Sequence, residues 1–337
     1  MTDSGSRPSA ATSSPQDWPA PLRPGDRVRL AAASSALDDT ERLEAGSAVL
    51  ASWGLAVEPH PSPLRRWGYL AGGDPERRAD LEAAAAAPLT ACVRGGWGAA
   101  RLLEQPLEQP AGWLLGFSDV TSLLWARWAR GLTGGIHGPR LTTLAAEPAW
   151  SQERLRRLLF GEPLDPLTGE VWSRGPGAGV VEGPLLVGNL TVATHLLGTA
   201  HLPELRGAVL VLEDVGEAPY RIERMLTHWR LAGALQQLAA IGFGSFSGCD
   251  DDDEDEDIEE NEEAGGAGAK AAERRGQRFS CEQVLRERSA DLGIPVLAGL
   301  PVGHRPGNAA LPVGARARLD TQRGLLSLVP PAPPRRP

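Results

Sequence analysis

The chain has 337 residues, 42% of them hydrophobic, which is enough for two domains with their own cores and excludes a wholly disordered protein. Its net charge is −9, but residues 250–263 carry 12 carboxylates, so the remainder sums to about +3 and offers no basic footprint for nucleic acid. No apolar stretch reaches the roughly 20 residues of a membrane span. The three cysteines, Cys92, Cys249 and Cys281, form neither a disulfide framework nor a zinc motif, so we expect a reduced protein without metal or cofactor.

Residues 1–23 are rich in Ser, Pro and Ala and lack the basic start and apolar run of a signal peptide. We expect them to form a disordered tail on a cytoplasmic protein, with a second, short tail at residues 331–337. The folded part of the chain is expected to begin at residue 24.

Short apolar runs alternate with amphipathic segments through the first half of the chain. Strands are predicted over residues 28–32, 55–58, 90–93 and 113–115, and helices over residues 40–53, 74–87, 98–104, 119–130 and 152–160. Asp74 is expected to cap its helix, because Pro75 follows at the first helical position. Strands that alternate with helices indicate a parallel sheet covered on both faces, and we place this first domain at residues 24–160. Ligands of such sheets bind at the carboxyl ends of the strands.

The pattern then changes to a stretch rich in Gly, Pro and Val, which predicts a linker over residues 161–178 and a second domain over residues 179–330. From here strands are predicted over residues 170–173, 179–182, 207–212, 239–243, 295–298, 316–319 and 325–329, and helices over residues 219–231 and 281–292. Residues 249–276 interrupt this domain with an acidic block and a Gly/Ala run, which predicts a disordered insertion. Acidic runs can bind cations or basic partners, but a tolerated surface loop is the simpler interpretation.

Two segments that follow predicted strands carry signals of a site. Residues 94–98 read RGGWG, and the glycines let the backbone approach a ligand closely with its N–H groups free to donate; a strand-to-helix turn needs glycine for structural reasons too. Residues 116–121 read GFSDVT, which puts Ser118 on a sharp turn at the start of a helix. The match to a GxSxG nucleophile turn is imperfect. On this segment alone Ser118 is either an exposed nucleophile or an ordinary helix cap.

Carboxylates and histidines that could serve such a serine occur later in the chain. Glu213, Asp214 and Glu217 follow a predicted strand, and position alone does not choose among them. Among the histidines, His304 and His137 are the two candidates for a place in the site. A serine hydroxyl needs an imidazole to activate it and a carboxylate to hold that imidazole in one tautomer.

The combination of segments resembles one family, the LD-carboxypeptidases, which are serine peptidases of peptidoglycan recycling. RGGWGAARLL at residues 94–103 resembles their RGGYGxxRLL run, and GFSDVT is similar to their nucleophile turn. LEDVGEAPYRIERML at residues 212–226 resembles a long and specific run of the same family. The likeness extends over roughly residues 24–329, although the acidic insertion replaces a shorter loop.

The resemblance implies a role for each matching residue. Ser118 is expected to be the nucleophile, His304 the general base and Glu213 the residue that orients it. The backbone N–H groups of Gly96 and Asp119 are expected to form the oxyanion hole. The residues expected to bind substrate are Arg94, Asn189, Arg221 and Arg224, although the arginines could equally form structural ion pairs with Asp214, Glu217 or Glu223.

The resemblance also implies a fold and a reaction. The fold is an α/β N-terminal domain with a parallel sheet of flavodoxin or Rossmann type and a smaller C-terminal domain of mixed strands and helices, in a homodimer. The reaction is metal-free hydrolysis of terminal D-Ala from the cytoplasmic murein tetrapeptide L-Ala-D-Glu-meso-diaminopimelate-D-Ala. A peptidase similar to those that give immunity to microcin C, which cleave peptidyl-nucleotides or aminoacyl-nucleotides, is an alternative, and a catalytically inactive muropeptide-binding protein is another.

Overall fold

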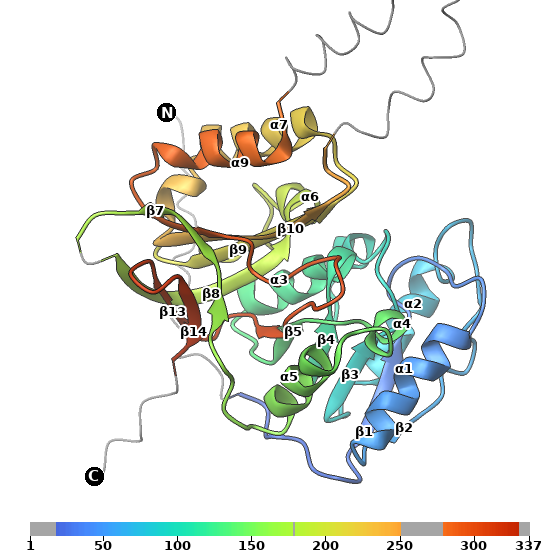
Figure 1. The fold of residues 1–337 in the computed structure, drawn as a ribbon. Helices are drawn as coiled ribbons and strands as arrows, with labels where there is room; N and C mark the ends of the chain where they lie inside the picture. Colours follow the sequence, from blue (N-terminus) through green and yellow to red (C-terminus); the bar gives the residue numbers. More distant parts are fainter. Residues whose placement is uncertain (1–17, 178, 251–278, 330–337) are drawn as a thin grey trace, which may run out of the picture.

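A computed structural model describes residues 18–177, 179–250 and 279–329 of the chain (Figure 1). Most of the predicted N-terminal tail, the acidic insertion and the C-terminal tail lies outside these described residues. Within them, no helix is both long and apolar enough to cross a membrane.

The first half of the chain builds five strands of a six-stranded sheet, whose order is β12-β5-β4-β3-β1-β2. The sixth strand, β12 (Leu311–Pro312), comes from the second half of the chain. All neighbouring pairs are parallel except β12 with β5. The central strands β3 and β4 are buried along their whole length, so their sequences, LTAC and WLLG, do not alternate between buried apolar and exposed polar residues. The elements of this half are β1 (Arg27–Ala31), α1 (Glu41–Ser52), β2 (Ala56–Val57), α2 (Asp74–Ala83), β3 (Leu89–Cys92), η1 (Ala100–Glu104), β4 (Trp113–Gly116), η2 (Ser118–Val120), α3 (Thr121–Ala129), β5 (Gly135–His137), α4 (Leu141–Leu144) and α5 (Ala149–Leu159).

The second half builds an eight-stranded sheet in the order β6-β14-β13-β8-β9-β10-β11-β7. Strands β8 to β11 are parallel to one another, and antiparallel strands complete both edges. Helices α7 and α9 lie together over one face of this sheet (Figure 1). The elements are β6 (Leu167–Thr168), β7 (Glu170–Arg174), β8 (Val180–Asn189), α6 (Leu190–His195), β9 (Val209–Val215), α7 (Pro219–Leu231), η3 (Leu235–Gln237), β10 (Ala240–Ser247), α9 (Cys281–Ala290), β11 (Pro295–Ala298), β12 (Leu311–Pro312), β13 (Arg316–Asp320) and β14 (Leu325–Leu328).

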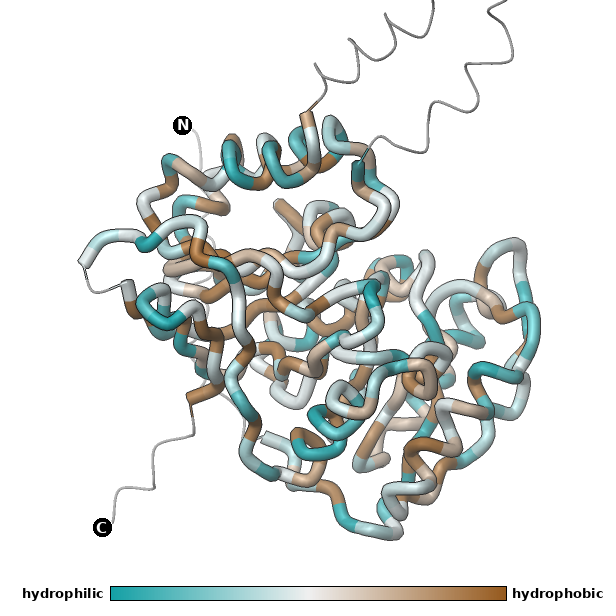
Figure 2. Tube along the Cα trace, in the orientation of Figure 1, coloured by the Kyte–Doolittle hydropathy of each residue, from teal (hydrophilic) through white to brown (hydrophobic). Residues whose placement is uncertain are grey.

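Helix α3 joins the two sheets. The indole Nε1 of Trp125 donates to the carbonyl oxygen of Val187 on β8 at 2.8 Å. The same ring packs edge-on to Trp229 of α7, with ring centroids 6.3 Å apart, so one hydrophobic core extends across both halves. Hydrophobic segments line this interior, and hydrophilic ones lie on the outer turns of the helices (Figure 2).

The predicted fold class, a domain with a parallel sheet followed by a domain of mixed strands and helices, is confirmed. Three local predictions differ from the structure. The cap of α2 is Gly73 and not Asp74, which is the first helical residue and pairs with Arg77. Strand β8 continues to residue 189 because its central position between β13 and β9 gives both its edges a partner. The chain also returns to the first sheet late, when β12 pairs with β5.

Candidate active site

Ser118 lies at the carboxyl end of β4, on a turn that the surrounding backbone holds in an unusual conformation. Its φ is +63°, and it is the one non-glycine residue at positive φ in the described ranges. That conformation costs a non-glycine residue about 1–2 kcal/mol, so tertiary contacts must maintain it. The glycine-rich turn at residues 94–98 lies close to Ser118, since a Cβ on Gly95 would lie 3.0 Å from the Ser118 Cβ. The Ser118 side chain caps no backbone N–H of the following helix.

The Ser118 hydroxyl contacts an imidazole and, through it, a carboxylate. The Ser118 Oγ lies 3.1 Å from Nε2 of His304, and Nδ1 of His304 lies 2.7 Å from Oε2 of Glu213. Glu213 is on β9 in the second sheet, so the three residues come from different parts of the chain. When the carboxyl is ionised, Nδ1–H donates to it, and Nε2 is left as an acceptor for the Ser118 hydroxyl proton.

Burial governs the electrostatics of Glu213. Its side chain is fully buried, and this raises the pKa of the carboxyl above its usual value, while the hydrogen bond from His304 opposes the rise. The neighbouring Asp214 is also buried. Asp214 accepts hydrogen bonds from the Asn189 side-chain amide at 2.8 Å and from the Thr191 backbone and hydroxyl at 2.9 and 2.8 Å. Its charge is therefore stabilised independently of Glu213 and His304.

A second set of contacts holds the loop that carries His304. The Asn308 side-chain oxygen accepts from the Gly303 N–H at 3.0 Å. A Glu147 oxygen accepts from the Gly307 and Asn308 N–H groups at 2.7 and 3.0 Å. Because Glu147 and Asn308 are buried, these bonds fix the loop on both sides of His304. Sequence reasoning missed both residues, and no local pattern marks them.

The Gly-rich turn at residues 94–98 lies against the Ser118 turn. Gly96 has φ +105°, and a Cβ there would lie 2.3 Å from the hydroxyl oxygen of Ser35. Within the described residues no acceptor is assigned to the Gly96 N–H. Asp119 accepts a hydrogen bond from the Ala99 N–H at 2.8 Å, and burial raises the pKa of this carboxyl. Gly96 and Asp119, the predicted oxyanion-hole residues, thus belong to two turns in direct contact.

His137, the alternative histidine, is not hydrogen-bonded to Ser118. It is completely buried, and burial lowers the pKa of its imidazole to about 3. Its ring packs against Phe117 with centroids 5.7 Å apart, while Phe117 also contacts the His304 ring at 4.8 Å. The structure therefore brings His304 to Ser118, and it places His137 behind the intervening phenyl ring.

Four residues were predicted to bind substrate, and in the structure they lie in different places with different contacts. Asn189 has both ends of its side chain engaged, by Asp214 and by the Val192 N–H. Arg94 donates to the Ala36 carbonyl oxygen at 2.8 Å. The remaining two, Arg221 and Arg224, lie on α7. A role in binding substrate stays a prediction for all four.

Arg140 is a further arginine that the sequence analysis did not select. It follows β5, the neighbour of β4, and shares a pocket of about 280 Å³ with Arg94. Its guanidinium carbon lies 4.9 Å from the centre of the Phe117 ring. Burial, followed by repulsion from Arg94, lowers the pKa of Arg140 to about 10. Within the described residues neither arginine is within ion-pair distance of a carboxylate, although Asp38, Asp39 and Glu41 line the same pocket. The signal that could have found Arg140 is its place at a strand's carboxyl end.

In the part of the chain that the structure describes, no group of three or more His, Cys, Asp or Glu side chains is arranged to hold a metal ion.

Comparisons with known proteins give two family matches. Residues 28–138 match the LD-carboxypeptidase N-terminal domain, and residues 182–319 match the LD-carboxypeptidase C-terminal domain. A provisionally named carboxypeptidase of Synechocystis is 44% identical over 92% of this chain and 97% of its own. The murein tetrapeptide carboxypeptidase of Pseudomonas aeruginosa is 35% identical over 92% of this chain and 97% of its own.

A solved structure shares the fold. The microcin C7 self-immunity protein MccF superposes with a TM-score of 0.75 over 93% of this chain and 98% of its own, at 22% identity. At this identity the likeness concerns the fold alone.

Proposed function

Because the chain belongs to the LD-carboxypeptidase family, we propose that it is a serine carboxypeptidase that releases the terminal D-Ala from a murein tetrapeptide. The observation that carries this proposal is the hydrogen-bonded series Ser118–His304–Glu213, with distances of 3.1 and 2.7 Å. The name of the Pseudomonas aeruginosa relative supports the substrate.

The first half of the reaction forms an acyl-enzyme. The Ser118 Oγ attacks the carbonyl carbon of the scissile amide, and its proton passes to Nε2 of His304. The carbonyl oxygen becomes an oxyanion and accepts hydrogen bonds from the N–H groups of Gly96 and Asp119. The same proton then passes to the amide nitrogen, the C–N bond breaks, and D-Ala leaves as the free amine.

The second half returns the enzyme to its starting state. A water molecule attacks the ester carbonyl, and its proton passes to Nε2 of His304. Collapse of this intermediate gives the proton back to the Ser118 Oγ and releases the shortened peptide. Glu213 keeps the imidazole in the tautomer that accepts the proton and stabilises the imidazolium formed in each half.

A carboxypeptidase also needs a group that recognises the free terminal carboxylate. We assign this role to Arg94 and Arg140, whose guanidinium groups share one pocket without an ion-pair partner in the described ranges. The Phe117 ring contacts both the Arg140 guanidinium and the His304 imidazole, at 4.9 and 4.8 Å. Through Phe117, Arg140 therefore lies near the position of a carboxylate bound beside the scissile amide, and Arg94 lines the same pocket. The proposal includes a cytoplasmic homodimer, as the family resemblance implies.

The test measures release of D-Ala from murein tetrapeptide. Wild type, Ser118→Ala and the control Ser62→Ala, an exposed serine, are incubated with the peptide. We expect release by wild type and control and none by Ser118→Ala. Equal release by Ser118→Ala would remove Ser118 from the mechanism. No release by wild type, together with cleavage of an aminoacyl-nucleotide conjugate, would replace the proposal by an immunity-type function.

A further inference from the structure

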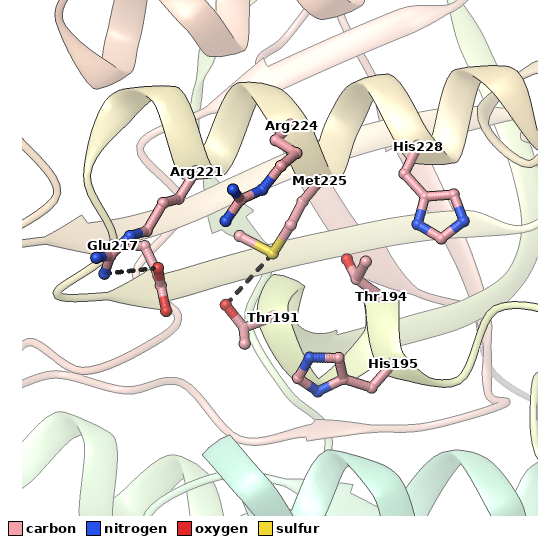
Figure 3. A pocket seen from close by; sticks show the side chains of 8 residues that line it. All are labelled: Thr191, Thr194, His195, Glu217, Arg221, Arg224, Met225 and His228. Atoms are coloured by element: carbon pink, nitrogen blue, oxygen red, sulfur yellow. Dashed lines mark hydrogen bonds and ion pairs between the residues drawn. The ribbon is translucent and has the colours of Figure 1, made fainter.

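A polar pocket lies between helices α6 and α7. It has a volume of about 530 Å³. Figure 3 shows the side chains that line it, namely Thr191, Thr194 and His195 on α6, Glu217 before α7, and Arg221, Arg224, Met225 and His228 on α7. Two guanidinium groups and one carboxylate thus share a space large enough for an amino-acid head group.

This pocket borders the active site on two sides. On one side, the Thr191 hydroxyl lies 2.8 Å from Asp214, the residue directly after Glu213, and 3.4 Å from the Met225 sulfur. On the other side, the His195 ring packs edge-on to Trp97 with centroids 6.2 Å apart. Trp97 directly follows Gly96 in the turn assigned to the oxyanion hole. Contacts of Thr191 and His195 therefore connect this pocket to residues next to the active site.

Arg221 is already engaged by neighbouring groups, because its Nε donates to the Tyr220 hydroxyl at 3.0 Å. Glu217 and Arg221 lie 3.7 Å apart, which is long for an ion pair between half-exposed side chains. The Arg224 guanidinium carbon lies 5.8 Å from the Tyr220 ring, and no carboxylate of the described residues is within ion-pair distance of it. Figure 3 shows the Arg224 guanidinium next to the Met225 side chain and the Glu217 carboxylate beside Arg221. The arrangement offers an acceptor for an ammonium group next to a donor for a carboxylate.

We propose that this pocket binds the zwitterionic end of the diaminopimelate side chain, with Arg224 contacting its carboxylate and Glu217 its ammonium group. The inference rests on the proposed function, with the tetrapeptide that the family resemblance implies, L-Ala-D-Glu-meso-diaminopimelate-D-Ala, in which diaminopimelate supplies the scissile carbonyl. Its side chain then leaves the reacting centre as a short alkyl chain and ends in an ammonium and a carboxylate on one carbon. Planar guanidinium groups match a carboxylate, and the charge of each partner strengthens the hydrogen bond.

Lysine provides a sharp comparison, because it is diaminopimelate without that second carboxylate. A tetrapeptide with lysine in the third position keeps the ammonium for Glu217 and loses the group for Arg224. The two pocket residues should therefore respond differently to the two peptides.

The experiment measures kcat/KM for D-Ala release from the diaminopimelate and lysine tetrapeptides. For Arg224→Gln we expect a loss of roughly tenfold on the diaminopimelate peptide, mainly in KM, and little change on the lysine peptide. Arg224→Lys should restore part of the loss. Glu217→Gln should weaken both peptides. The control Arg206→Gln removes an exposed charge outside the pocket and should change neither.

The outcomes separate this inference from the proposed function. If wild type releases no D-Ala from either peptide, the proposed function fails and this inference fails with it. If wild type cleaves the diaminopimelate peptide but Arg224→Gln reduces both peptides equally, or neither, the pocket assignment is overturned while the proposed function stands.

Discussion

Replacing Glu213 by glutamine tests whether this carboxylate sets the tautomer and charge of His304. In the native site, Oε2 of Glu213 lies 2.7 Å from Nδ1, and Oε1 has no hydrogen-bond partner in the described structure. A glutamine that turns its NH₂ group to Nδ1 makes that nitrogen an acceptor. The ring proton then moves to Nε2, which faces Ser118 and can no longer take its proton. A glutamine that turns its oxygen to Nδ1 keeps the tautomer but brings no charge.

The size of the effect follows from burial. A hydrogen bond to a charged group contributes about 1.5–3 kcal/mol, and the imidazolium formed during the reaction also loses its nearby negative charge. In the Ser-His-Asp triad the equivalent change lowers kcat about 10⁴-fold. We therefore expect Glu213→Gln to reduce kcat by about 10³–10⁴, equivalent to roughly 4–5.5 kcal/mol of barrier, with little change in KM.

The assay compares kcat for D-Ala release by wild type, Glu213→Gln and the control Glu108→Gln, an exposed glutamate. Thermal unfolding of each protein shows whether the fold is retained. Glu108→Gln should match wild type. A folded Glu213→Gln enzyme that keeps more than about a tenth of the wild-type kcat would refute the reasoning, because that loss is too small for either orientation of the amide.

Four further outcomes follow from the same contacts. Burial raises the pKa of Glu213 in the folded protein, so stability is lost as pH rises through that pKa; Glu213→Gln should have the higher Tm at pH 7–8, and the difference should vanish below about pH 4. Gly96→Ala should lower kcat about 10²–10³-fold, because its Cβ would lie 2.3 Å from the Ser35 hydroxyl and displace the oxyanion turn. Glu147→Ala should lower kcat by freeing the His304 loop, whereas Glu147→Gln, which keeps an acceptor, should restore most of it. A chelator should leave the rate of D-Ala release unchanged.

Much of the fold could be predicted because its strands are locally distinctive. The run at residues 113–116 is apolar and buried along its length, and its neighbours in the parallel sheet are buried along their lengths as well. The two-residue strand β12 could not be predicted, since its partner β5 lies far away in the sequence and the pairing depends on the tertiary fold. The start of α2 was misplaced by one residue. Gly73 has the extended backbone conformation of a helix cap, and its N–H donates a hydrogen bond to the Glu76 side chain.

The candidate site shows a similar division. Ser118, Glu213 and His304 could be selected because each stands in a motif, and the motifs together resemble one family. Glu147 could not be selected, because a buried glutamate that accepts two N–H groups from a distant loop has no local sequence pattern. The same holds for Arg140, whose interest depends on its contact with the Phe117 ring and on having no carboxylate within ion-pair distance among the described residues.

The geometry around Ser118 also depends on how the two sheets are joined. Ser118 follows a strand of the first sheet, and Glu213 lies on a strand of the second, so their separation is set where α3 meets β8. There the Asn189 N–H donates to the Thr121 hydroxyl at 3.1 Å, three residues after Ser118. Gly188 permits this approach, because a Cβ at that position would lie 2.5 Å from the Thr121 methyl group. Asn189 is paired with Glu213 in the register of β8 and β9. The glycine and the threonine that surround this contact therefore position the hydroxyl against the imidazole, although neither belongs to the hydrogen-bonded series itself.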